Sequence, residues 1–165
     1  MCHIHLAIKE TRRVPEARAF YDTMEETLNV VIRTSGKFYS YIQGEKYSID
    51  LDRRGNVLGM EIFAPQKEWE VVPGLTPPEK AELRKIRILE HRKEIEPLGF
   101  FTDEQGRFCC MRFTEENVSY YFMVAQDLVF EVNVMDELSA VWALNLVQDF
   151  GFKKEMKYRK GMNVA

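Results

Sequence analysis

Cysteine is scarce in this sequence, and long apolar runs are missing from it. Only three of the 165 residues are cysteines and two of those are adjacent, which excludes a disulfide framework. No apolar stretch approaches the roughly 18 residues that a membrane-spanning helix needs. The first residues show no basic region followed by an apolar one, so no signal peptide and no membrane partner are expected. These absences favour a protein of the reducing cytoplasm.

An excess of charge of one sign is missing as well. The net charge of −3 gives no electrostatic reason to expect nucleic acid as a partner. The sequence has no Gly-rich phosphate loop and no nucleophile elbow, and its three histidines lack the flanking pattern of a hydrolase. No cofactor is therefore expected.

What the sequence does contain is a pattern that recurs after 81 positions. Residues 20–64 align with residues 101–145 without a gap, and apolar positions fall on apolar positions. The clearest matches place Leu28, Val30 and Ile32 over Cys109, Met111 and Phe113, and Tyr47, Ile49 and Leu51 over Leu128, Phe130 and Val132. This pattern predicts a single domain over residues 1–165 that is built from two similar units.

The first unit is expected to consist of strands. Residues 27–34 and 46–52 alternate between apolar and polar side chains, which is typical of half-buried strands. Turn-forming residues follow each segment, and Gly55 supplies the positive φ that a tight hairpin needs. A four-stranded antiparallel meander is predicted. Its last segment, 57–63, is apolar on both faces, which a bulge near Gly59 or burial on both faces would explain.

The segment between the units carries the signals of a helix. Residues 76–79, Thr-Pro-Pro-Glu, match a capping box with proline at the first helical position. Leu83, Ile86 and Leu89 follow at helical spacing. The predicted fold class is therefore α+β, with two antiparallel β-meander units and a helix at about 76–96 between them.

The last element of the second unit fits two structures. The repeat predicts a strand over residues 138–147. A possible N-cap at Asp136 and a possible C-cap at Gly151 favour a helix instead. The sequence leaves both open.

Part of the first unit resembles a known family. It begins with Phe20-Tyr21-Asp22 and a strand, and it ends with an acidic hairpin and a strand over residues 50–62, Asp-Leu-Asp-Arg-Arg-Gly-Asn-Val-Leu-Gly-Met-Glu-Ile. This arrangement resembles the YuzE-like domain family over about residues 20–64, with a degenerate second copy at 101–145. The resemblance implies a small antiparallel α+β fold with no catalytic residues, and it suggests an antitoxin-like role. The second copy departs from the family where Asp136, Ala140 and Trp142 replace Gly55, Gly59 and Glu61.

Two histidines are the candidate metal ligands. On a strand, His3 and His5 project to one face, where two imidazoles can share a metal ion. Cys2, next to His3 in the same segment, projects to the other face. A structural zinc site needs four ligands, so the remaining donors would have to arrive by folding: His91, Cys109 and Cys110. The acids Asp50, Asp52 and Glu61 form a second candidate set, able to act as acid and base or to hold a divalent cation. Surface histidines and turn-forming acids are the simpler interpretation of both sets.

Four tyrosines are the candidates for a binding surface: Tyr41, Tyr47, Tyr120 and Tyr121. Aromatic residues are enriched at protein interfaces, although tyrosines also fill cores. A basic tail, residues 153–160, is expected to be solvated.

Two hypotheses of function follow. The favoured one is a small soluble non-enzymatic interaction or binding protein with a protein partner, a monomer or weak dimer. The alternative is a small metal-dependent enzyme or metal-binding protein that uses the N-terminal histidines or the hairpin acids.

Overall fold

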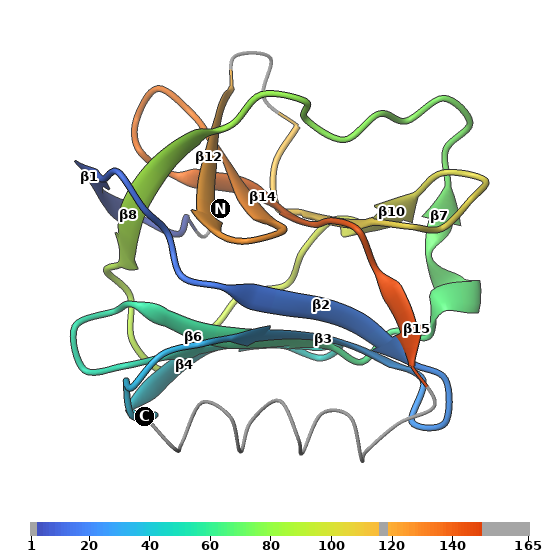
Figure 1. Cartoon of the computed structure of the whole chain (residues 1–165), viewed down its shortest axis with the longest axis horizontal. Helices are drawn as coiled ribbons and strands as arrows, with labels where there is room; N and C mark the ends of the chain where they lie inside the picture. Colours follow the sequence, from blue (N-terminus) through green and yellow to red (C-terminus); the bar gives the residue numbers. More distant parts are fainter. Residues whose placement is uncertain (1–2, 116–118, 150–165) are drawn as a thin grey trace.

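The computed structural model describes residues 3–115 and 119–149, which form two β-sheets packed face to face (Figure 1). The seven-stranded sheet has the order β15 (Val147–Asp149), β2 (Ala17–Asp22), β3 (Thr27–Ile32), β6 (Val57–Ile62), β5 (Tyr47–Leu51), β4 (Ser40–Gly44) and β9 (Lys93–Glu94). The eight-stranded sheet has the order β1 (Leu6–Glu10), β8 (Glu82–Ile88), β12 (Tyr120–Ala125), β13 (Leu128–Val132), β14 (Leu138–Ala143), β11 (Cys109–Arg112), β10 (Gly99–Thr102) and β7 (Glu70–Val71).

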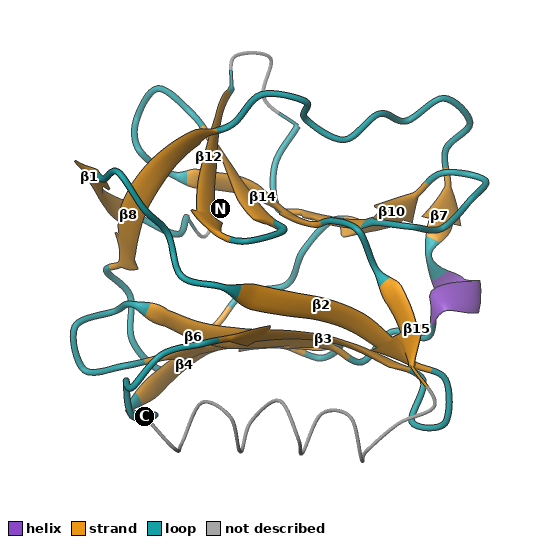
Figure 2. Cartoon of the chain, viewed as in Figure 1, coloured by secondary structure: helices purple, strands orange, loops and turns teal. Residues whose placement is uncertain are grey.

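The predicted helix at 76–96 is wrong, and with it the α+β class. Among the described residues the only helical element is a short 3-10 turn, η1 (Gln66–Glu68), and none is long and apolar enough to cross a membrane (Figure 2). Thr76 Oγ1 donates to the Gly74 carbonyl, 3.1 Å away, instead of capping a helix. Strand β8 occupies the centre of the segment.

Strand β8 forms because it has partners along both edges. It pairs antiparallel with β1 and parallel with β12, and such long-range pairing overrides a local capping signal. Burial along the strand alternates: Ile86 and Ile88 lie in the core while Arg87 is exposed. Leu89, which the helical spacing places on the buried face, is 51% exposed.

The strand order also differs from the predicted meander. Strand β3 pairs with β6 instead of β4, so residues 33–39 cross from one side of the sheet to the other. The part β4–β5–β6 is a meander, as predicted. Of the two explanations offered for the apolar segment 57–63, the bulge near Gly59 is present: Leu51 pairs with Val57 and Asp50 pairs with Gly59, which leaves Leu58 without a cross-strand partner. Residues 138–143 are the strand β14.

The two halves of the chain pair their strands in the same order. The order β2-β3-β6-β5-β4 in one sheet corresponds to β10-β11-β14-β13-β12 in the other. Registers agree as well: Leu28 pairs with Ile62, and Cys109 pairs with Ala143, each 81 residues further along. A register shift also recurs, between Asp50 and Leu51 and between Glu131 and Val132.

Each sheet is completed by a strand that follows the other half. Strand β7 comes after the last strand of the first half, β6, but pairs in parallel with β10 of the second half. Strand β15 comes after β14 of the second half but pairs in parallel with β2 of the first. The two halves therefore cannot separate without breaking strand pairs.

The main core lies between the sheets. Side chains of both inner faces meet there, among them Leu28, Ile49, Ile62, Phe130 and Val141, which are at most 1% exposed. A second, smaller cluster covers the outer face of the eight-stranded sheet, where Phe108 and Trp142 pack with Leu75 from the connecting segment.

Candidate functional site

Two tight hairpins of the same construction lie between β5 and β6 and between β13 and β14. We call residues 52–56 the first hairpin and residues 133–137 the second hairpin. Asp52 Oδ1 accepts from the backbone N–H groups of Arg54 and Asn56, both at 2.9 Å. In the second hairpin, Asn133 Oδ1 accepts from the corresponding N–H groups of Met135 and Glu137, again both at 2.9 Å.

The turn conformation is also shared. Gly55 has a φ of 88°, as the sequence predicts, and Asp136 takes its place with a φ of 57°. Aspartate tolerates this left-handed conformation better than most residues, so the loss of glycine does not abolish the turn. Burial raises the pKa of Asp52, but hydrogen bonds from Asn56, Arg54 and Gly55 outweigh it and lower the pKa below its ordinary value. The carboxylate is thus a structural part of the turn.

The tips of the two hairpins carry opposite surface chemistry. The first hairpin presents Arg53 and Arg54. The second presents Val134 and Met135, which are 61% and 73% exposed. Val134 and Met135 are adjacent apolar side chains at the end of a hydrogen-bonded turn, and we therefore treat the second hairpin as a candidate contact site.

The predicted histidines converge on the base of the second hairpin. Glu137 Oε2 lies 3.4 Å from His3 Nδ1 and 3.4 Å from His5 Nε2. The other ring nitrogen of His5, Nδ1, lies 2.7 Å from Glu90 Oε2. The N-terminal segment is also tied down through its backbone, since Leu6 N donates to the Asp136 carbonyl at 2.9 Å.

These contacts explain what the histidines do in the fold. The expectation that His3 and His5 share a face agrees with their ring centroids lying 6.3 Å apart. His5 Nδ1 is hydrogen-bonded to Glu90, whereas the buried His3 Nδ1 lies 3.4 Å from Glu137 Oε2 and has no hydrogen-bond partner among the described residues. Within residues 3–115 and 119–149, no group of three or more His, Cys, Asp or Glu side chains is arranged to hold a metal ion.

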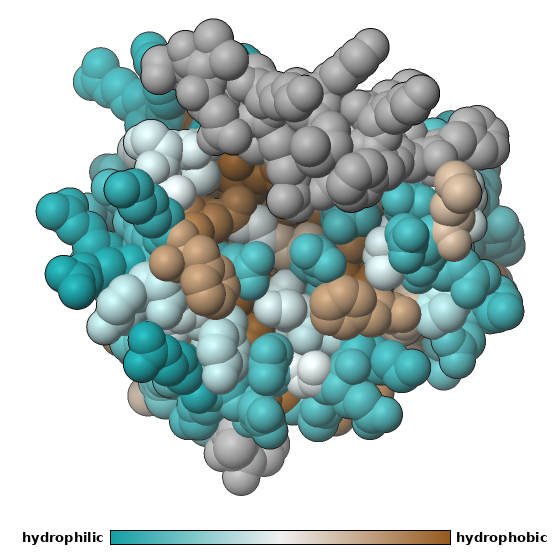
Figure 3. Space-filling view, turned by 90° about the horizontal axis from the view of Figure 1, so that it is seen from below, coloured by the Kyte–Doolittle hydropathy of each residue, from teal (hydrophilic) through white to brown (hydrophobic). Residues whose placement is uncertain are grey.

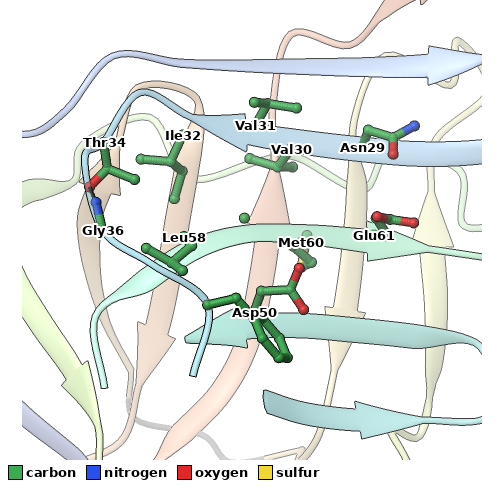
Figure 4. Close-up of a pocket in the computed structure, with 12 residues that line it drawn as sticks. Asn29, Val30, Val31, Ile32, Thr34, Gly36, Asp50, Leu58, Met60 and Glu61 are labelled. Atoms are coloured by element: carbon green, nitrogen blue, oxygen red, sulfur yellow. Dashed lines mark hydrogen bonds between the residues drawn. The ribbon is translucent and has the colours of Figure 1, made fainter. Parts of the chain in front are cut away.

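Two of the three hairpin acids share a hollow on the outer face of the seven-stranded sheet. Asp50 and Glu61 line it together with Asn29 and Val31, in a space of about 290 Å³ (Figure 4). Ser48 Oγ donates to Asp50 Oδ1 at 3.2 Å. The described residues that line the hollow include no histidine, cysteine or lysine that would complete a catalytic set. Around it, hydrophilic and apolar side chains are interspersed where the face is not drawn grey (Figure 3).

The corresponding position in the eight-stranded sheet is filled. Glu131, at the position of Asp50, is 2% exposed and accepts from Arg112 Nη1 at 2.8 Å and Nη2 at 3.0 Å. Trp142 Nε1, at the position of Glu61, donates to the same carboxylate at 3.1 Å. Burial raises the pKa of Glu131, but Arg112, Trp142 and Ser119 together lower it below its ordinary value. This buried pair has a structural role.

The cysteines of the second half are inert. Cys109 faces the main core and Cys110 the outer cluster, as their adjacency on a strand requires. Burial raises the pKa of Cys110 to about 12, despite the nearby Arg112. The thiol is therefore protonated at neutral pH, and a reactive role has no support.

The candidate tyrosines do not form one surface. Tyr47 is fully buried and donates from its hydroxyl to the Ile95 carbonyl at 2.6 Å, so it cannot contact a partner. Tyr41 lies on β4 of the seven-stranded sheet, whereas Tyr120 and Tyr121 lie on β12 of the other. Cys2 and the basic tail 153–160 lie outside the described residues.

Sequence reasoning missed the tip of the second hairpin. Val134 and Met135 extend an apolar strand pattern, so they resemble core residues until the turn is known. The alignment of Asn133 with Asp52 was the signal available, because both residues can accept backbone hydrogen bonds in a turn. No protein-family model matches the chain, and no curated protein matches it significantly.

Proposed function

We propose that this chain is a non-enzymatic protein-interaction module whose contact point is the tip of the second hairpin. The exposure of Val134 and Met135 is the observation that carries the proposal. Burying both side chains in a partner's apolar pocket would contribute about 3 to 5 kcal/mol to binding.

The hairpin is suited to this role because it is already rigid. Asn133 Oδ1 fixes two backbone N–H groups of the turn, and Asn133 Nδ2 donates to Glu137 Oε1 at 3.0 Å. Glu137 Oε2 in turn lies 3.4 Å from His3 Nδ1 and 3.4 Å from His5 Nε2. A tip that is ordered before binding loses little conformational entropy when it docks.

The test is a comparison of three baits in a lysate of the source organism. The wild-type chain is compared with Val134→Arg/Met135→Arg, which gives the second tip the residues of the first. Arg53→Ser/Arg54→Ser alters the equivalent tip and serves as the matched control. We expect at least one protein to be captured by the wild type and the control, and lost with the arginine variant.

A result in which all three baits capture the same proteins in the same amounts would contradict the proposal. Circular dichroism of each bait establishes that the variants are folded. Because both tips lie outside the core, neither pair of substitutions is expected to change the spectrum.

The YuzE-like resemblance supports the same class of function. It covers the first hairpin and brings no catalytic residue, and the antitoxin-like role it suggests is one of protein binding. A monomer or weak dimer in the cytoplasm is the state we propose, since the two halves already complete each other's sheets.

A metal-binding role is the second candidate. It is favoured by the two histidines that contact one carboxylate, Glu137. A structural zinc site needs four ligands, and the described residues bring no group of three or more His, Cys, Asp or Glu side chains together to hold a metal ion. We therefore expect elemental analysis to find no stoichiometric transition metal in the purified protein. About one zinc per chain, lost on His3→Ala/His5→Ala, would favour the metal-binding role instead.

A further inference from the structure

Four cationic side chains surround a small hollow beside the first hairpin. Lys9, Arg54, Lys85 and Arg87 line it with Ala7, Ile8 and Asn56, and its volume is about 190 Å³. None of the described residues that line it carries a carboxylate. Such a concentration of positive charge is unexpected in a chain whose net charge is −3.

The backbone forces these cations together. Lys9 and Lys85 are direct cross-strand partners in the antiparallel pair β1–β8, and Arg87 lies two residues from Lys85 on the same face. Like charges placed directly opposite each other destabilise a sheet. The first hairpin adds Arg54, because Asn56 forms a bridge with Arg87 and Ile88 N donates to the Gly55 carbonyl at 2.8 Å.

Nothing in the described part of the chain neutralises the four charges. None of the four forms an ion pair with a described residue. Asp52, in the same hairpin as Arg54, uses Oδ1 for backbone N–H groups and Oδ2 for Asn56 Nδ2. Glu10 is the cross-strand neighbour of Arg84 on the opposite face of the strand pair, and Arg84 forms its ion pair with Glu82.

We propose that this hollow binds a phosphate group of a small phosphorylated ligand. A phosphate carries about −1.5 to −2 charges and three acceptor oxygens, which suits donors converging from three segments better than a single carboxylate does. The two arginines supply planar forks of N–H donors, and the two lysines supply point charges. Binding also relieves the repulsion between Lys9 and Lys85. This site is independent of the apolar tip of the second hairpin.

The test measures the melting temperature of the whole chain against added ligand at constant ionic strength. The probes are inorganic phosphate, pyrophosphate and ATP, with chloride as the reference. We expect at least one of the three to raise the melting temperature of the wild type, as any ligand of the native state does. A response to inorganic phosphate identifies the free anion as sufficient, whereas a response to ATP alone identifies a nucleotide.

Two variants with equal change of charge make the test specific. Lys9→Ser/Lys85→Ser removes the opposed lysines, and Lys37→Ser/Lys46→Ser removes two exposed lysines outside the hollow. We expect the first pair to weaken the Kd of the bound probe about tenfold or more and the second to leave it unchanged. Without ligand, the first pair is also expected to melt higher than the wild type, because the cross-strand repulsion is gone.

Three results would overturn the proposal. One is a wild type that responds to none of the three probes at millimolar concentration. Another is an equal loss of binding in both lysine variants, which would indicate general charge attraction. The third is an RNA oligonucleotide that binds and loses affinity with Lys9→Ser/Lys85→Ser while the small phosphates do not bind, which would indicate a polymer surface.

Discussion

Equivalent residues in the two halves have taken different roles. Asp50 lines an open hollow, whereas Glu131, 81 residues later, is buried under Trp142 and paired with Arg112. The difference arises because Arg112, which pairs with Glu131, corresponds to the apolar Val31 in the first half, so the first half has no arginine at the equivalent position. A carboxylate that is buried without its cation would cost several kcal/mol, so Glu131 and Arg112 depend on each other.

The pair gives a prediction about acid stability. Glu131→Gln should lower the free energy of unfolding at neutral pH by about 2 to 3 kcal/mol, since Arg112 loses its ionic partner. The folded-state pKa of Glu131 is below its unfolded value. Its contribution is therefore present above the unfolded pKa of about 4.3 and lost as the pH falls through the folded pKa.

Urea unfolding of both proteins at pH 7 and in acid measures this effect. The difference between wild type and Glu131→Gln should shrink as the pH falls below about 4. Asp50→Asn is the matched control at the equivalent position and should cost less. A difference that does not depend on pH would show that ionisation of Glu131 is irrelevant to stability.

At the scale of the element, the alternation of apolar and polar residues predicted where strands lie but not which strands pair with each other. Strands β3 and β5 follow from period-two patterns in residues 27–34 and 46–52, and Gly55 marks the turn. Strands β7, β9 and β15 have two or three residues each, too few for any pattern, and they exist because a longer strand offers an edge. The same reason explains β8, whose capping signal indicated a helix.

The candidate site was predictable only in part. The alternation of His3 and His5 placed both on one face, but their partners, Glu90 and Glu137, come from residues far away in the chain. The hollow with four cations was less visible still, since Lys9 and Lys85 become neighbours only through the pairing of β1 with β8.

The first hairpin gives a prediction about backbone strain. Gly55 has a φ of 88°, and a Cβ there would lie 2.2 Å from the Ile88 carbonyl oxygen. Gly55→Ala should therefore cost at least about 2 kcal/mol of stability, from the left-handed conformation and the clash together. Gly74 also has a positive φ, of 78°, but a Cβ there meets nothing within 4 Å.

Gly74→Ala is thus the control that separates the cost of the left-handed conformation from the cost of the clash with Ile88. It carries the conformational cost alone, about 1 kcal/mol. Chemical denaturation of both variants makes the comparison. Equal losses would mean that the close approach of the first hairpin to β8 contributes nothing.

At the scale of the whole molecule, the two halves exchange strands. Strand β7 completes the sheet of the second half and β15 completes that of the first. The fluorescence of Trp69 would report on the main core, and that of Trp142 on the smaller outer cluster. Trp69 packs against Tyr21 with ring centroids 5.8 Å apart, and Trp142 packs against Phe108 in the outer cluster, also at 5.8 Å.

Exchange of strands predicts cooperative unfolding. Each of the variants Trp69→Phe and Trp142→Phe keeps one tryptophan. In each variant, the urea midpoint measured by fluorescence of that tryptophan should equal the midpoint measured by circular dichroism. Fluorescence midpoints that differ from the circular dichroism midpoint of the same variant would show that the halves unfold separately.

The two hairpins share their backbone hydrogen bonds and differ in the chemistry of their tips. The most direct test exchanges the tips in a single protein, with Arg53→Val, Arg54→Met, Val134→Arg and Met135→Arg. We expect a melting temperature close to that of the wild type, because the bonds of Asp52 and Asn133 are retained. Phosphate binding and partner capture should both fall, since Arg54 leaves its hollow and the apolar tip leaves its site. A folded variant that keeps both activities would contradict the account.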